Sequence, residues 1–364
     1  MGAASLGDAT QAVILAGGQG TRLRPLTLAR AKPVVPVLTR PLLGWQLALL
    51  RAHGVTDVIL ACSYRVEDVR RALGEAEHLG VRLRYVIEAE PLGTGGGVRN
   101  AADLARGTVF VLNGDVLTDA DLSAMRRFHE ERGSRTTIFL TRVADPRAYG
   151  LVEAEADGRL RRFREKPGPE EPIETDTINA GIYLLDAALL GRIPTGRAVS
   201  IEREFFPALI ADGVPCYGWA ASAYWRDIGS PAAYWETQRD LLLGRAAMPV
   251  APPGDEHDGC WVDTTAHVAA GAHLVAPSVL GRGVRVGIGA RIGPLTVLGE
   301  ETRIGADARV TGSVLWERVT VGPEAVLEDC VIGADVDIGP QARVAAGAIV
   351  ASGSSVGPRA TVTA

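Results

Sequence analysis

The C-terminal third of the chain repeats an aliphatic residue at every sixth position, and this repeat restricts the fold more than any other feature. Glycine often follows the repeated residues, which are Val268, Leu274, Leu280, Val286, Ile292, Leu298, Ile304 and Val310. The spacing slips across residues 311–328 and then resumes at Ile332. Such hexads are typical of a parallel β-helix, in which each hexad forms one side of a triangular coil and its aliphatic side chain faces inward. We therefore predict a left-handed parallel β-helix over residues 262–364.

Such a coil could serve either as an acyl-transferase site or as an oligomerisation scaffold. An acyl-transferase site on it would need a catalytic histidine between subunits, and His267 and His273 are six residues apart, so we expect them to stack on one face. The alternative is an oligomerisation or scaffolding role, which we favour because a coil with an exposed flat face tends to pair with another. The sequence therefore predicts a homo-oligomer.

Residues 12–243 show a different pattern, in which short apolar runs alternate with segments of helical spacing. The expected strands cover 12–15, 57–61, 83–87, 108–112 and 136–143, and the expected helices cover 42–53, 66–73 and 120–132. This alternation predicts an α/β domain with strand–helix–strand units around a mixed, mainly parallel sheet. Proline and glycine cluster after residue 243, so we divide the chain into a domain at 1–243, a linker at 244–261 and the coil at 262–364.

Charge and composition exclude several classes of function. The 38 basic and 43 acidic residues give a net charge of −5, so no global positive field is present to hold nucleic acid or an anionic membrane. The four cysteines are widely spaced, which indicates neither a zinc site nor a disulfide framework. No apolar run approaches the ~20 residues that cross a bilayer, and residues 1–11 lack the features of a secretory signal. We expect a cytoplasmic protein without nucleic-acid or membrane partners.

The most informative motif directly follows the first expected strand. It reads Leu15-Ala16-Gly17-Gly18-Gln19-Gly20-Thr21-Arg22-Leu23-Arg24-Pro25-Leu26-Thr27, and Lys32-Pro33 follows. Its three glycines allow backbone N–H groups to approach a phosphate chain closely, while Arg22 and Lys32 supply positive charge. The spacing matches neither the dinucleotide-binding G-x-G-x-x-G motif nor the P-loop. The alternative is a tight structural turn with solvated basic side chains.

This segment resembles the signature of the sugar-1-phosphate nucleotidylyltransferases, G-G-x-G-T-R-L-x-P-L-T followed by K-P, and every fixed position is present. The resemblance continues through Glu88, Pro91-Leu92-Gly93-Thr94-Gly95-Gly96, Asn113-Gly114-Asp115, Tyr149-Gly150, Glu165-Lys166-Pro167, Asn179-Ala180-Gly181, Ser200-Ile201-Glu202-Arg203-Glu204 and Tyr224-Trp225-Arg226-Asp227-Ile228-Gly229. Within the family, the sequence is most similar to mannose-1-phosphate guanylyltransferases that end in hexapeptide repeats. The resemblance implies a Rossmann-like nucleotidyltransferase domain that transfers GMP from GTP to mannose 1-phosphate, releasing pyrophosphate, with Mg²⁺ as cofactor.

The resemblance also implies roles for individual catalytic residues. Arg22 would contact the triphosphate and the departing pyrophosphate, and Lys32 would lie near the α-phosphate. Asp115 and Asp227 would hold Mg²⁺ between the α-phosphate and the sugar phosphate. A phosphate monoester has its second pKa near ~6, so the nucleophile is already anionic at neutral pH and needs no general base. Either aspartate alone could instead cap a helix or begin a turn.

Binding residues follow from the same matches. We expect the nucleotide at Leu15, Ala16, Gly17, Gly18, Gly20, Thr21, Arg22, Glu88, Pro91, Gly93, Thr94, Asn113 and Gly114. A carboxylate at Glu88 can accept from guanine N1–H and the exocyclic amine, which favours GTP because uracil and thymine lack that donor pair. Alternatively, Glu88 faces solvent at a strand end. We expect the sugar phosphate at Gly150, Glu165, Lys166, Asn179 and Trp225, with Lys166 cradling its phosphate.

Three alternative functions stay open. The acceptor could be a cyclitol or pseudo-sugar 1-phosphate of the valienol type, or glucose 1-phosphate, in secondary metabolism. A bifunctional uridylyltransferase/acetyltransferase shares the two-part design, although its repeat domain is usually longer. A catalytically silent regulatory subunit would keep the fold, but such subunits tend to lose the key Arg, Lys or Asp residues, and Arg22, Lys32, Asp115 and Asp227 are all present.

Overall fold

The computed structural model describes residues 11–74, 76 and 79–364. The first ten residues, on which the prediction about a secretory signal rests, lie outside this range. Contacts divide the chain into two compact units: residues up to 19 with 46–227, and residues 20–45 with 228–364. The glycine-rich motif is therefore shared, because Leu15–Gln19 belong to the first unit and Gly20–Lys32 to the second.

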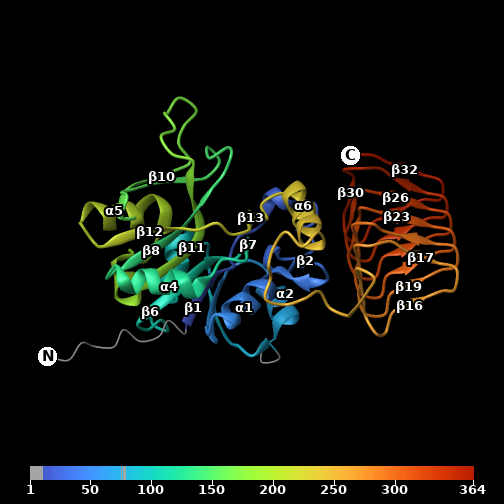
Figure 1. The fold of residues 1–364 in the computed structure, drawn as a ribbon, viewed down its shortest axis with the longest axis horizontal. Coiled ribbons are helices and arrows are strands. Elements are labelled where there is room, and N and C mark those ends of the chain that lie inside the picture. The colour runs from blue at the N-terminus through green and yellow to red at the C-terminus, as the bar shows by residue number, and fades with distance from the viewer. Residues whose placement is uncertain (1–10, 75, 77–78) are drawn as a thin grey trace. The chain divides into compact units, whose positions relative to one another are not determined.

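The first unit is built on a nine-stranded sheet in the order β10-β9-β11-β6-β1-β4-β5, in which β8 also pairs with β11 and β12 pairs with β8 (Figure 1). Strands β5, β4, β1 and β6 are parallel, whereas β11 runs antiparallel to β6, β8 and β9. The predicted mixed α/β sheet is confirmed, and its parallel pairs lie among β5, β4, β1 and β6 and between β8 and β12. The strands are β1 (Gln11–Leu15), β4 (Asp57–Cys62), β5 (Arg82–Ile87), β6 (Thr108–Asn113), β8 (Thr136–Arg142), β9 (Gly150–Ala154), β10 (Leu160–Glu165), β11 (Thr177–Asp186) and β12 (Cys216–Ala220).

The three helices expected from the spacing of apolar residues are present as α1, α2 and α4, whereas α3, α5 and α6 were not expected. α2 (Val66–Leu73) buries Val69 and Leu73 on one face, as an amphipathic helix should. α4 (Leu122–Glu131) begins where Asp121 Oδ1 accepts a hydrogen bond from the Ala124 N–H at 2.9 Å. The remaining helices are α1 (Leu42–Ala52), α3 (Gly93–Asn100), α5 (Phe206–Ala211) and α6 (Pro231–Leu242). Buried aliphatic residues of the central strands, such as Val13, Ile59 and Val111, form the core of the first unit.

The second unit contains a coil of parallel strands, seen stacked in orange and red in Figure 1. Three sheets form its sides, in the orders β14-β15-β18-β21-β24-β27-β30, β16-β19-β22-β25-β28-β31 and β17-β20-β23-β26-β29-β32, and β14 alone joins its sheet antiparallel, beside β15. Their bounds are β14 (Asp255–His257), β15 (Cys260–Val262), β16 (His267–Val268), β17 (His273–Leu274), β18 (Ser278–Leu280), β19 (Arg285–Val286), β20 (Arg291–Ile292), β21 (Thr296–Leu298), β22 (Arg303–Ile304), β23 (Arg309–Thr311), β24 (Val314–Leu315), β25 (Thr320–Val321), β26 (Val326–Glu328), β27 (Val331–Ile332), β28 (Asp337–Ile338), β29 (Arg343–Val344), β30 (Ile349–Val350), β31 (Ser355–Val356) and β32 (Thr361–Val362).

The slip in the hexad repeat has a simple structural cause. Leu298 pairs with Leu315 in the next turn of the coil, and Leu315 with Ile332, so the coil continues without interruption. The inward residue after Val310 is Leu315, and the one after Leu327 is Ile332, each five positions on instead of six. One side of the coil is therefore one residue shorter in these two turns.

The expectation that His267 and His273 stack on one face is wrong. His267 lies on β16 and pairs with Arg285, whereas His273 lies on β17 and pairs with Arg291. These strands belong to different sheets because each hexad is one side of the coil, so a step of six residues leads to the next side. Residues three hexads apart are the ones that stack.

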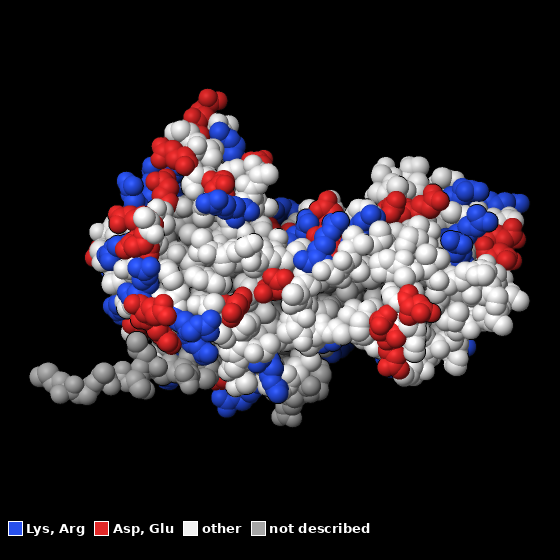
Figure 2. Space-filling model, in the orientation of Figure 1, with Lys and Arg blue, Asp and Glu red and all other residues white. Residues whose placement is uncertain are grey.

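Several expectations concern the chain as a whole. The four cysteines are free and buried. Within residues 11–74, 76 and 79–364, no helix is both long and apolar enough to traverse a bilayer. On the face shown in Figure 2, basic and acidic side chains are intermixed.

Burial of His129 predicts a pH-dependent stability. His129 is 4% exposed, and burial lowers the pKa of its imidazole to about 4 while Nδ1 lies 2.8 Å from the Thr137 hydroxyl. A lowered folded-state pKa stabilises the fold above the unfolded value of ~6.5, and this contribution is lost as pH falls toward 4. The full effect is about 3 kcal/mol. Denaturant unfolding between pH 7 and pH 4 should show a shallower loss of stability in His129→Gln than in the wild type; equal slopes would contradict this.

Candidate active site

Two short strands bring the predicted aspartates together. β7 (Val116–Thr118) pairs antiparallel with β13 (Trp225–Asp227), and Asp227 is the register partner of Val116. Asp115 immediately precedes Val116 and follows β6, so the two aspartate residues lie where β6 ends at its carboxyl edge. Both side chains are half-buried. This is the edge at which open α/β sheets bind ligands.

Gln46 of α1 fixes the turn that carries Asp115. Its buried Nε2 donates to the carbonyl of Asn113 at 2.9 Å and to that of Val116 at 2.7 Å, so it holds both ends of the turn. Gly114 N–H donates to Leu15 O at 2.9 Å, and a Cβ at Gly114 would lie 2.6 Å from the same oxygen. Only glycine therefore fits where β6 and β1 end side by side.

The first part of the glycine-rich motif leaves the sheet at the same edge. Ala16 N–H donates to Ala61 O at 2.8 Å, and the Ser63 hydroxyl donates to Gly17 O at 2.7 Å. A Cβ on Gly18 would meet nothing within 4 Å, so space is open beside this residue. Asn113 Oδ1 is buried and has no hydrogen-bond partner among the described residues. This end of β1 and β6 thus offers open space and a polar acceptor.

The predicted sugar-side residues also cluster in the first unit. Gly150 pairs with Glu165, and a Cβ at Gly150 would lie 2.6 Å from Glu165 Oε2. Lys166 Nζ lies 3.8 Å from Glu165 Oε1. Burial, reinforced by the Glu202 carboxylate, raises the pKa of Glu165. The Glu165 carboxylate is therefore packed against the backbone of Gly150 and lies beside the Lys166 ammonium group.

Asn179 and Trp225 are held by the β11 backbone and its neighbours. Asn179 Nδ2 donates to the Tyr183 hydroxyl at 2.8 Å, while its Oδ1 accepts from the Gly181 N–H at 3.0 Å. Trp225 Nε1 donates to Ala180 O at 2.8 Å, and its ring lies edge-on to Tyr149. Burial, together with the negative charges of Glu202, Glu165 and Asp115, raises the pKa of Tyr183 well above its usual value. The buried Tyr183 hydroxyl is therefore held protonated and hydrogen-bonded to Asn179.

The loop expected to recognise the base is anchored from both ends. Glu88 is 8% exposed, and its Oε2 accepts from the Leu92 N–H at 3.0 Å. Thr94 Oγ1 donates to Glu202 Oε2 at 2.7 Å and accepts from the Ile201 N–H at 2.9 Å. The alternative that Glu88 faces solvent is wrong, because its side chain is buried and its carboxylate binds the backbone of the loop that leads into α3.

Arg22 and Lys32 belong to the second unit. Gly20 has φ 62°, and a Cβ there would lie 2.9 Å from Lys32 Cβ, so glycine is needed for both reasons. The Thr27 hydroxyl donates to Gly20 O at 2.7 Å and closes the turn. Lys32 is 7% exposed, whereas Arg22 is exposed on a short 3₁₀ helix at Thr21–Leu23. The segment thus fixes the lysine closely while the arginine projects outward.

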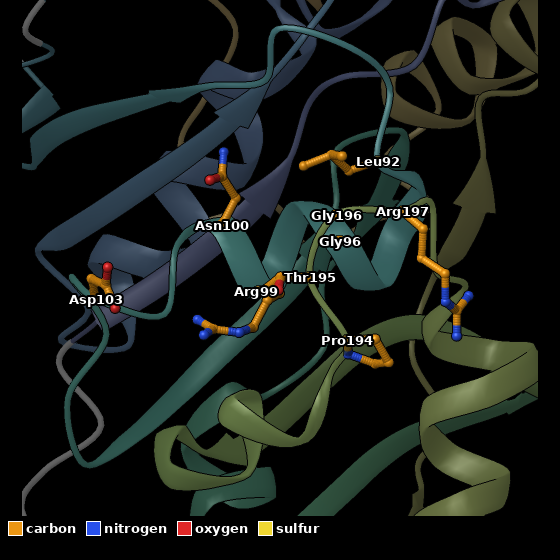
Figure 3. A pocket seen from close by; sticks show the side chains of 9 residues that line it. All are labelled: Leu92, Gly96, Arg99, Asn100, Asp103, Pro194, Thr195, Gly196 and Arg197. Atoms are coloured by element: carbon orange, nitrogen blue, oxygen red, sulfur yellow. The ribbon is translucent and has the colours of Figure 1, made fainter.

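A cavity of about 290 Å³ lies elsewhere in the first unit (Figure 3). It is lined by residues in and beside α3 and by the loop at 194–197. These residues are Leu92, Gly96, Arg99, Asn100, Asp103, Pro194, Thr195, Gly196 and Arg197. None of the carboxylates described above borders this cavity. It does border Leu92, whose N–H group donates to Glu88 in the loop expected to recognise the base.

Sequence reasoning missed three residues that build the site. Gln46 and Ser63 act through hydrogen bonds to distant backbone carbonyls, and no local pattern identifies such partners. Glu202 is 9% exposed and accepts from both Thr94 and Ser200 hydroxyls. Its block, Ser200-Ile201-Glu202-Arg203-Glu204, contributes to the family resemblance, and that signal could have singled it out.

Comparison with known families decides what kind of protein has this site. The family model described as Nucleotidyl transferase matches residues 11–243. The chain belongs to the nucleotidyl transferase family. This nucleotidyl transferase also matches the EIF2B subunit epsilon LbH domain model over residues 257–362, which confirms the left-handed β-helix.

Individual relatives agree with this assignment. The nucleotidyl transferase is 41% identical over 323 residues to a mannose-1-phosphate guanylyltransferase of Mycobacterium tuberculosis, covering 87% of this chain and 82% of that protein. It is 40% identical to the mannose-1-phosphate guanylyltransferase catalytic subunit beta of Drosophila pseudoobscura pseudoobscura, over 66% of this chain and 62% of that protein. Among solved structures, HddC from Yersinia pseudotuberculosis is 28% identical with a TM-score of 0.55, over 64% of this chain and 99% of that one.

Proposed function

We propose that the protein transfers GMP from GTP to mannose 1-phosphate, forming GDP-mannose and pyrophosphate, with Mg²⁺ as cofactor. The observation that carries this proposal is the pairing of β7 with β13, which brings Asp227 beside Asp115 at the carboxyl edge of β6. The names of the 41% and 40% identical relatives support GTP and mannose 1-phosphate as substrates.

The donor set at this edge fits a hard divalent cation. Asp115 and Asp227 offer carboxylate oxygens, and Mg²⁺ prefers one or two carboxylates together with water and substrate phosphates. When bound, such an ion neutralises charge on the phosphate oxygens and helps to align the two reacting groups. A site with only two protein carboxylates leaves coordination positions for the substrates.

The chain's own residues supply binding and positioning. The sugar phosphate oxygen attacks the α-phosphorus of the triphosphate, the bond to the β-phosphate oxygen breaks, and pyrophosphate leaves. Because both reactants are anions, bringing them into line and neutralising their charge is the main catalytic task. We assign Arg22 to the triphosphate and pyrophosphate, Lys32 to the α-phosphate region, and Lys166 to the sugar phosphate.

Nucleotide recognition is proposed at the ends of β1, β5 and β6. Leu15–Gly18, with Gly20 and Thr21, would face the phosphates through backbone N–H groups. Glu88, in the loop with Pro91, Gly93 and Thr94, would accept from guanine, and the unsatisfied Asn113 Oδ1 beside Gly114 offers a further acceptor. Glu165 and Asn179 would form hydrogen bonds with the sugar hydroxyls, and Gly150 and Trp225 would also contact the sugar phosphate.

The remaining expectations are part of the same proposal. We propose that the protein is cytoplasmic, that it divides into 1–243, a linker at 244–261 and 262–364, and that it forms a homo-oligomer through the coil. Light scattering after deletion of residues 262–364 tests the last point, because an unchanged oligomer would contradict it.

A cyclitol phosphate or glucose 1-phosphate is the second candidate acceptor, since the types of the sugar-side residues do not show which configuration of sugar hydroxyls they bind.

One experiment tests the proposed function directly. Purified full-length protein with Mg²⁺ is given each of GTP, ATP, UTP, CTP and dTTP against mannose, glucose and pseudo-sugar 1-phosphates, and pyrophosphate release is followed. Fastest turnover with GTP and mannose 1-phosphate is expected. Faster turnover with UTP or dTTP would reject the role of Glu88 in guanine selection, and no turnover with any pair would support the silent-subunit alternative.

Glu165→Gln should weaken sugar binding without affecting the nucleotide. Loss of the charged acceptor is expected to raise KM for the sugar 1-phosphate about tenfold while KM for GTP stays unchanged. Since burial raises the pKa of Glu165, the wild type should lose sugar affinity on acidification at a higher pH than an ordinary glutamate would. Initial-rate kinetics from pH 8 to pH 5 measure both effects. Exposed Glu155→Gln is the control, and a wild-type pH profile retained in Glu165→Gln would refute the role.

A further inference from the structure

Within the second unit, buried hydrogen bonds connect the coil to the segment at 20–45. Trp316 Nε1 donates to the Tyr234 hydroxyl at 2.8 Å, and this hydroxyl donates to Pro36 O. Gln238 also binds this segment, because its Nε2 donates to Pro36 O at 3.0 Å and its Oε1 accepts from the Leu38 N–H at 2.8 Å. Trp316, Tyr234 and Gln238 are at most 1% exposed. Bonds between fully buried groups are costly to break, so this connection is firm.

A charged contact reinforces the connection. Both terminal nitrogens of Arg30 donate to the Glu317 carboxylate, and the Arg30 guanidinium carbon lies 4.8 Å from the centre of the Trp316 ring. The side chains of Arg30 and Glu317 are 24% and 17% exposed. A partly buried two-point arginine–carboxylate pair fixes geometry better than an exposed pair does. It fixes Arg30 two residues before Lys32.

The coil residues of this contact lie where the hexad repeat slips. Trp316 directly follows Leu315, the first inward residue after a five-residue side. A Cβ on Gly299 would lie 2.4 Å from the Trp316 carbonyl carbon, so the turns of the coil are in close contact at this point. Trp235 and Arg239 of α6 contact the same region, through Gly312 O at 2.9 Å and Asp329 at 3.3 Å. The irregular turns thus form the docking surface for α6 and for the segment at 20–45.

We propose that Trp316 and Glu317 are positioning residues for nucleotidyl transfer: through Tyr234 and Arg30, the coil holds the segment that carries Arg22 and Lys32. This inference rests on the proposed function, because it assumes that these two cations meet the triphosphate. The coil then takes part in catalysis without touching substrate. It sets the position of charges that must lie in line with the reacting phosphates, where small displacements lower the rate strongly.

Three variants of the full-length chain test the inference. Tyr234→Phe keeps the buried ring and removes its hydroxyl, Trp316→Phe replaces the indole by a smaller aromatic ring without the N–H donor, and Glu317→Gln removes the charge that holds Arg30. The control is Glu300→Gln, which breaks the exposed Arg282–Glu300 pair on the same coil. Hydrogen exchange without substrate should be about tenfold faster in peptides from 20–45 of the three variants and unchanged in coil peptides. Their kcat should fall about tenfold while KM for the sugar 1-phosphate is unchanged.

Each outcome decides a different point. Unchanged exchange at 20–45 in Tyr234→Phe and Glu317→Gln would overturn the anchoring, whether or not the protein is active. Faster exchange with unaltered kcat in an active enzyme would overturn the positioning role. A wild type that is inactive with every substrate pair would contradict the proposed function, and the exchange data would still decide the anchoring. Equal rate losses in Glu300→Gln would indicate a general effect of coil stability and would also refute the inference.

Discussion

Asp115→Asn is expected to lower kcat about a thousandfold while leaving the fold intact. The substitution keeps the size and shape of the side chain but removes one of the two carboxylate charges at the carboxyl edge of β6. A group that stabilises charge in the transition state typically contributes a factor of 10² to 10³, and loss of the cation adds to this. Pyrophosphate release at saturating substrates measures the effect.

The control for Asp115→Asn is Asp121→Asn in the same stretch of chain. Asp121 caps α4 through the Ala124 N–H, and asparagine caps a helix equally well, so this variant should keep wild-type activity. Raising the Mg²⁺ concentration should restore part of the rate of Asp115→Asn. Wild-type turnover in Asp115→Asn would overturn the mechanism proposed here.

Gly114→Ala is expected to lower kcat about a hundredfold although it changes no charged group. Its Cβ would lie 2.6 Å from the Leu15 carbonyl oxygen, which belongs to the central strand β1 and cannot move away. The turn must shift instead, the Gly114–Leu15 hydrogen bond is weakened, and Asp115 moves with its neighbour. Displacements of about 1 Å cost roughly this factor in rate.

A matched variant distinguishes this displacement from a general effect of alanine. Gly191 has no atom within 4 Å of an added Cβ, so Gly191→Ala should retain activity. Thermal unfolding should show about 1–3 kcal/mol of destabilisation in Gly114→Ala, as in other overpacked sites. Full activity in Gly114→Ala would show that the position of Asp115 relative to β1 does not matter.

Local periodicity predicted the coil, five of the nine strands of the main sheet and three of the six α-helices in the described residues. The spacing of apolar residues predicts α2 at 66–73 with the bounds that the structure shows, and the hexads predict the coil because each inward residue must repeat once per side. The error about His267 and His273 arose from the same repeat. One full turn of the coil takes three hexads, so a residue stacks on the one three hexads away and not on the one in the next hexad. The two five-residue sides were visible only as a slip in spacing.

The supports of the site could not be predicted in the same way. Motifs locate Asp115 and Asp227, but their proximity depends on a β7–β13 pairing between segments about a hundred residues apart. Gln46 and the Tyr234–Trp316 pair act through single long-range hydrogen bonds, which leave no periodic signal. Glu88 directly follows β5, and its position at a strand end suggested exposure to solvent. The loop that follows packs against it and buries it. Such contacts depend on tertiary packing, which local sequence patterns do not encode.

The proposed mechanism requires Asp115 and Asp227 to hold the divalent cation together. Anomalous diffraction from crystals of the full-length protein grown with Mn²⁺ and a non-hydrolysable GTP analogue would locate this ion. We expect an anomalous peak within coordination distance of a carboxylate oxygen of each aspartate, with an α-phosphate oxygen as a further ligand. A Mn²⁺ peak bound to the nucleotide but distant from both carboxylates would contradict it.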